Sequence, residues 1–87
     1  MSVSPINRLD VEIAGEPYVL KSEASIEHME KVVRLVQQKI KEAKERNNLL
    51  PPIKTVVAAA LNIADEYLQL KANHEQLLHL IEVEQTK

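Results

Sequence analysis

The chain has 87 residues and no cysteine, so it forms one small domain without disulfides or thiolate-bound metals. Chains of this size bury only a small core and usually need a cross-link, a metal or a partner, which makes self-association the expected source of stability. A formal net charge of −2, with 11 Lys and Arg against 13 Asp and Glu, argues against a nucleic-acid-binding surface, because such surfaces concentrate positive charge.

The location of the protein is expected to be cytoplasmic. The first residues lack the basic and apolar regions of a signal peptide. No apolar run approaches the ~18 residues that cross a bilayer, so no membrane partner is expected.

The first predicted element is a β-hairpin over residues 8–21, preceded by a flexible tail at residues 1–7. Apolar and polar residues alternate over residues 9–13, which is typical of a half-buried strand. Gly15-Glu16 is predicted to form a type II′ turn with glycine first, because glycine accepts a positive φ. Pro17 then fits an edge or the start of the return strand, since it cannot donate a backbone hydrogen bond.

A helix of medium length is predicted over residues 25–46. Ser22 or Ser25 can cap its start, and Asn47-Asn48 suits its end because asparagine tolerates the left-handed conformation found there. Apolar residues recur in it at spacings of three and four, as in an amphipathic helix: Ile26, Met29, Val33, Val36, Ile40 and Ala43.

A second, much longer helix is predicted to start at Pro51-Pro52 and to run to about Glu84. Proline is favoured at the first position of a helix, and no Gly or Pro interrupts the rest. The expected length of ~33 residues corresponds to about 50 Å. Average helices are about a third as long.

Apolar residues recur in a heptad pattern along this helix, which indicates a coiled coil and accounts for its length. The apolar stripe is wide up to Leu68, where the first helix and the hairpin are predicted to pack, and narrow beyond it, where only another copy can cover it. The predicted organisation is thus a head at residues 8–50 and a long helix with a coiled-coil stalk at residues 51–87. The predicted oligomer interface consists of the a and d positions Ile53, Val56, Ala60, Ile63, Tyr67, Leu70, His74, Leu77 and Ile81.

Catalytic, metal and cofactor sites are not expected. His74 and His79 lie five residues apart, so they point about 140° apart on a helix and cannot share a zinc ion as histidines four apart do. Asp65 and Glu66 are neighbours that diverge by about 100°, and a single glycine cannot build a phosphate-binding loop. The fold class expected is α+β, mostly α: a hairpin, a medium helix and a long, self-associating coiled-coil helix.

Two motifs resemble the ZapA family over residues 8–85. They are Val11-x-Ile13-x-Gly15-x-x-Tyr18-x-Leu20 before a helix, and Ala60-Leu61-Asn62-Ile63-Ala64-Asp65-Glu66-Tyr67 within a long one. The resemblance implies a non-enzymatic cytoplasmic regulator that binds the tubulin-like GTPase FtsZ and bundles its filaments at the midcell division ring. It also implies a parallel dimer through the stalk, with dimers able to pair into tetramers.

Charged head residues carry much of the FtsZ interaction in that family. The matching region here, near the end of the first helix, is Lys44, Glu45 and Arg46. An alternative from another class is a structural coiled-coil adaptor subunit whose partner is a different protein.

Overall fold

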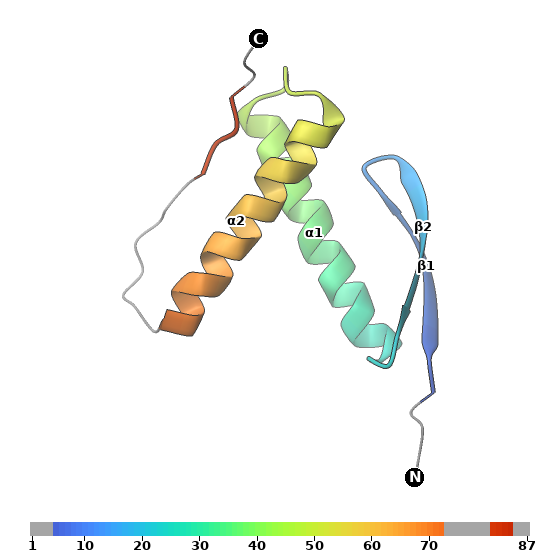
Figure 1. The fold of residues 1–87 in the computed structure, drawn as a ribbon. Helices are drawn as coiled ribbons and strands as arrows, with labels where there is room; N and C mark the ends of the chain where they lie inside the picture. The colour runs from blue at the N-terminus through green and yellow to red at the C-terminus, as the bar shows by residue number, and fades with distance from the viewer. Residues whose placement is uncertain (1–4, 73–80, 85–87) are drawn as a thin grey trace. The chain divides into compact units, whose positions relative to one another are not determined.

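The computed structural model describes residues 5–72 and 81–84. Its elements are the strands β1 (Asn7–Ile13) and β2 (Glu16–Ser22), followed by the helices α1 (Ile26–Arg46) and α2 (Pro52–Ala72) (Figure 1). The predicted order of a hairpin and two helices, with a mostly helical chain, is confirmed. None of the helices in the described part of the chain is both long and apolar enough to cross a membrane.

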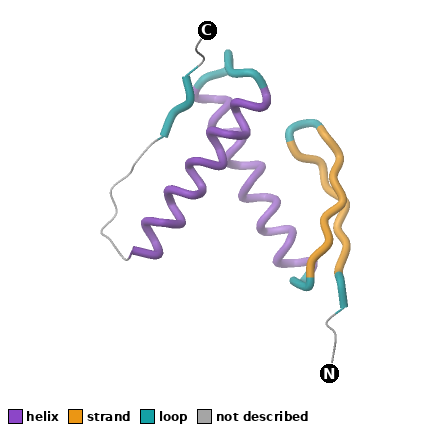
Figure 2. Tube along the Cα trace, in the orientation of Figure 1, coloured by secondary structure: helices purple, strands orange, loops and turns teal. Residues whose placement is uncertain are grey.

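The chain divides into two compact units, residues 1–37 and 38–87. The boundary lies within α1, which is continuous in sequence and hydrogen bonding from Ile26 to Arg46. The first unit contains the hairpin and the first part of α1. The second contains the last turns of α1, the connection and α2 (Figure 2).

The hairpin turns at Ala14-Gly15 rather than at Gly15-Glu16. Both turn residues have positive φ, 55° and 81°, which defines a type I′ turn and corrects the predicted type II′ turn. The reason is Pro17. A loop at residues 15–16 would require the N–H of residue 17 to close the turn, and proline has none. With the turn at residues 14–15, Ile13 and Glu16 close it.

Pro17 therefore lies opposite Glu12 in the ladder. Hydrogen-bonded and non-hydrogen-bonded pairs alternate along an antiparallel hairpin. Because Ile13 and Glu16 form a hydrogen-bonded pair, the next pair is a non-hydrogen-bonded one and needs no N–H from proline. The outward carbonyl of Glu12 is also used, because it accepts a hydrogen bond of 2.8 Å from Nε2 of Gln37 in α1. At the other end of the hairpin, Nδ2 of Asn7 donates to the carbonyl of Ala24 at 2.8 Å.

Ser25 is the N-cap of α1. Its hydroxyl accepts a hydrogen bond of 3.0 Å from the N–H of His28, which satisfies one of the free donors of the first turn. Met29 and Val33, one turn apart on α1, are the buried apolar residues among the described residues 5–37 of the first unit. They lie in the predicted stripe.

Asn47 ends α1, as predicted. Its N–H still donates to the carbonyl of Ala43 at 3.1 Å, and its side-chain Oδ1 accepts from the N–H of Leu49 at 3.1 Å. This local turn leads the chain into Leu50, which is buried, and then into the first residue of α2, Pro52. The predicted restart at the two prolines is confirmed.

The predicted extent of the second helix is wrong at residues 81–84, which are not helical. α2 ends at Ala72, and residues 73–80 lie outside the described part of the chain. The physical reason at Ile81 is a competing partner: the side chain of Asn62 bonds both its N–H, at 3.0 Å, and its carbonyl, at 2.8 Å. Backbone groups bonded in this way cannot also serve the hydrogen-bond ladder of a helix.

The type I′ turn yields a prediction for Ala14. A left-handed conformation costs an L-residue with a Cβ about 1–2 kcal/mol, whereas Asn-Gly is the favoured pair for this turn. We expect Ala14→Asn to raise the free energy of unfolding by about 0.5–1 kcal/mol, measured by denaturant titration at fixed protein concentration. As a control, Gly15→Ala should lower it, although its Cβ would meet open space. Stabilisation by Gly15→Ala would contradict the turn assignment.

Candidate functional site

One face of α2 is packed within the second unit, and its side chains are small. Thr55, Ala58 and Ala59 are buried, with Ala59 only 1% exposed. The hydroxyl of Thr55 donates to the carbonyl of Pro51 at 3.2 Å, so this buried polar group is satisfied. Ala43 of α1 is also buried. Small side chains on both helices limit how much apolar area this unit removes from water.

The opposite face of α2 is apolar and exposed. Spacings of three and four place its residues on one side of the helix. The large ones are strongly exposed, with Ile53 at 69% and Tyr67 at 59%. The α2 stripe, as we name this surface, consists of Ile53, Val57, Ala60, Leu61, Ala64, Tyr67 and Leu68.

The α2 stripe overlaps only in part with the predicted interface. The a positions Ile53, Ala60 and Tyr67 belong to it. The d positions Val56 and Ile63 are instead half-buried in their own chain. Leu70, the next d position, is 73% exposed. His74 and Leu77 lie outside the described residues, and Ile81 is bound by Asn62.

Four residues of the α2 stripe lie outside the predicted interface: Val57, Leu61, Ala64 and Leu68. Val57, Leu61 and Leu68 were expected to pack against the first helix and the hairpin, but they are 44%, 42% and 59% exposed. The prediction was wrong because it assigned every apolar residue outside the a and d positions to the chain's own core. The apolar residues at positions 53, 57, 60, 64 and 67, spaced four and three apart, were the sequence signal that could have identified this exposed face.

An ion pair joins α1 and α2 inside the second unit. Lys39 of α1 forms an ion pair with Glu66 of α2 and lies 3.9 Å from Glu42 of its own helix. Glu42 also accepts a hydrogen bond of 3.1 Å from Gln38. On α2 itself, the ammonium of Lys71 lies 5.9 Å from the ring centroid of Tyr67, a cation–π contact.

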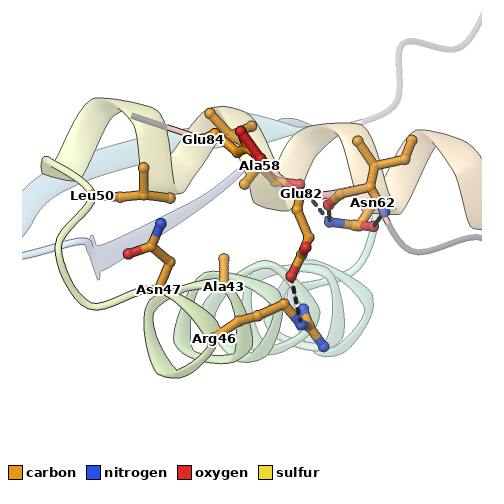
Figure 3. Close-up of a pocket in the computed structure, with 10 residues that line it drawn as sticks. Ala43, Arg46, Asn47, Leu50, Ala58, Asn62, Glu82 and Glu84 are labelled. Carbon is orange, nitrogen blue, oxygen red and sulfur yellow. Dashed lines mark hydrogen bonds and ion pairs between the residues drawn. The ribbon is translucent and has the colours of Figure 1, made fainter. Parts of the chain in front are cut away.

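The candidate partner-binding residues Lys44, Glu45 and Arg46 are exposed at the end of α1. Lys44 and Arg46 are two residues apart and so point about 200° apart around the helix axis, which separates them onto different surfaces. Arg46 does not pair with Glu42, one turn earlier. Its Nε lies 3.9 Å from Oε2 of Glu82, in a half-exposed ion pair (Figure 3).

A cavity of about 250 Å³ lies in the second unit, where residues 81–84 run beside the ends of the two helices. Figure 3 shows Asn62 and Arg46 directed at this segment from α2 and α1. Within residues 5–72 and 81–84, no group of three or more His, Cys, Asp and Glu residues is placed to bind a metal ion.

Comparison with known proteins identifies the family. The family model described as cell division protein ZapA matches residues 9–87. The chain belongs to the ZapA family. Cell division protein ZapA of Shouchella clausii (strain KSM-K16) is 41% identical over 68 residues, covering 78% of this chain and 87% of that protein. ZapA of Geobacillus thermodenitrificans (strain NG80-2) is 38% identical over 77 residues, covering 88% and 85%.

A solved ZapA structure has the same fold. It is a ZapA mutant dimer from Geobacillus stearothermophilus, 34% identical, with a TM-score of 0.68 over 84% of this chain and 85% of that one. The resemblance to ZapA based on the hairpin and α2 motifs is thereby confirmed.

The two faces of α2 in this ZapA family member predict opposite responses to larger side chains. Ala59→Leu inserts three carbon atoms into a packed face and should lower the free energy of unfolding by about 1–3 kcal/mol. Ala72→Leu, at an exposed position of the same helix, is the matched control and should change it by less than about 0.5 kcal/mol. Denaturant titration at equal concentrations measures both. Equal losses would contradict the assignment of the buried face.

Proposed function

We propose that this chain is a non-enzymatic regulator of bacterial cell division that binds FtsZ and cross-links its filaments at the midcell division ring. In this proposal the active species is a coiled-coil homodimer, which can pair into a tetramer. The single observation that carries the self-association is the exposed α2 stripe. The division role rests on membership of the ZapA family.

The α2 stripe supports dimerisation through its continuity. Its residues extend along one side of the helix from Ile53 to Leu68, and the large ones are exposed. Exposed apolar patches of this kind are typical of protein contacts, because burying them releases about 25 cal/mol per Å². The dimeric state of the ZapA mutant from Geobacillus stearothermophilus supports the same association here.

Bridging follows from dimerisation. A dimer carries two copies of the head, and simultaneous binding of two sites on filaments raises the effective affinity without strong individual contacts. Lys44, Glu45 and Arg46 remain the proposed contacts with FtsZ. Arg46 is favoured among them, because its planar guanidinium can bind a carboxylate through two hydrogen bonds. A chain that dimerises but does not bind FtsZ would instead be a coiled-coil adaptor for another partner.

Leu68→Asp tests the interface. Leu68 is 59% exposed in one chain, so the variant chain should fold, but a carboxylate buried between two copies should weaken the dimer by several kcal/mol. Sedimentation velocity at micromolar concentration should show a shift from dimer to monomer. Leu70→Asp adds the same charge at an exposed position about 160° away around the helix, outside the α2 stripe, and should leave the dimer intact. A wild-type chain that sediments as a folded monomer would refute the proposed interface.

Arg46→Glu tests the partner surface. The half-exposed pair with Glu82 contributes less than about 1 kcal/mol, so fold and dimer should persist while co-sedimentation with FtsZ filaments falls. Arg34→Glu makes the same charge change at an exposed position of α1 and should have little effect. Leu68→Asp, which is expected to break the dimer, should reduce bundling, measured by light scattering, more than it reduces binding. Equal binding by wild type and Arg46→Glu would remove Arg46 from the interface.

A further inference from the structure

Lys71 is the first charged residue in line with the α2 stripe. It follows Ile53 by 18 residues, which is about five turns at 3.6 residues per turn, so both side chains point in the same direction from the helix axis. The residues of the α2 stripe itself are all uncharged, whereas Lys71 is exposed and carries a positive charge. One cation therefore lies in the same line as the surface proposed to meet a second copy.

Tyr67 determines where this charge lies. The ammonium nitrogen of Lys71 is 5.9 Å from the centroid of the Tyr67 ring, and Tyr67 belongs to the α2 stripe and is 59% exposed. A cation is attracted to the face of an aromatic ring. This contact holds the ammonium over the stripe, so a surface that covers the stripe also meets the cation.

A second copy is the occupant that the α2 stripe favours. An uncharged apolar surface complements another copy of itself, and the related ZapA mutant from Geobacillus stearothermophilus is a dimer. In a parallel pair related by a two-fold axis, residues of the stripe lie at the same level as their own counterparts. Lys71 then lies beside the partner's Lys71. In an antiparallel pair it would lie beside the start of the stripe, near Ile53, and would meet no second cation.

We propose that Lys71 is a specificity residue of the self-association surface and lies beside the partner's Lys71 in a parallel pair of copies. The inference rests on the dimer proposed above and adds a pairing rule to it. Two lysines at this position repel, whereas a lysine and an acidic residue attract. One charged residue in an apolar interface fixes register at a cost in stability. The charge thus selects which chains pair, and the apolar residues supply the affinity.

Mixing chains of opposite charge tests this rule. Wild type labelled with 15N and unlabelled Lys71→Glu are mixed in equal amounts, and the dimers are counted by native mass spectrometry. In about 10 mM ammonium acetate, heterodimers should exceed the half expected for random pairing and reach about four fifths. In about 1 M salt, where the Debye length is only about 3 Å, the fraction should return towards half. Random pairing at both salt concentrations would overturn the pairing rule.

The exchange isolates the contact between copies. Each wild-type chain keeps its own Tyr67 contact in both kinds of dimer, so the loss of that contact in the variant cancels. Lys41→Glu is the matched control, because it reverses the same charge at an exposed position of α1. It should pair with wild type at random. An equal excess of heterodimers with Lys41→Glu would overturn the assignment to Lys71, since net charge alone would then explain the pairing.

A single thiol tests the placement without the charge. The chain has no cysteine, so oxidation of Lys71→Cys can link two copies only through position 71. Disulfide formation should be at least about tenfold faster than in Leu70→Cys, whose side chain points about 100° away. Equal rates would overturn the placement of position 71 between the copies. A wild type that forms no dimers would refute the proposed dimer itself, whereas dimers that pair at random would refute this inference alone.

Discussion

The small amount of apolar surface that one chain can bury governs this structure. In the described residues the buried apolar set is Met29, Val33, Ala43, Leu50, Ala58 and Ala59, and half of these are alanines. Burial of an alanine removes little area from water compared with a leucine or isoleucine. The larger apolar side chains of α2 lie on its other face and remain exposed. One of the two apolar faces of this helix is thus left uncovered within the described residues of the chain.

The difference in burial between the two faces of α2 follows from side-chain size. Alanines at positions 58 and 59 form a face that other elements can approach closely, and the buried hydroxyl of Thr55 donates to the carbonyl of Pro51, just before the helix. Bulky residues such as Ile53, Tyr67 and Leu68 project from the other side. Intrachain packing and self-association can therefore coexist on one helix without competing for the same side chains.

Asn62 connects the helix to the segment at residues 81–84 through hydrogen bonds rather than through apolar packing. Its amide bonds the carbonyl of Ala58 and both backbone groups of Ile81. Backbone hydrogen bonds are exclusive, since each N–H has one proton to donate. The N–H of Ile81 is therefore bonded to Asn62 rather than to the carbonyl of a preceding helical turn.

Local chemistry in the sequence determined the elements: the β alternation before Gly15, the Ser25 cap, the Asn47 stop and the restart at Pro52 all lie where one or two residues fix the backbone. The same local chemistry determined the turn type, because Pro17 excludes a two-residue loop at residues 15–16. Only the tertiary structure decided which apolar face of α2 is buried and what residue 81 bonds to. The physical reason is that helical periodicity identifies faces but not their partners, and the contact of Asn62 with Ile81 joins residues 19 positions apart, which no local pattern encodes.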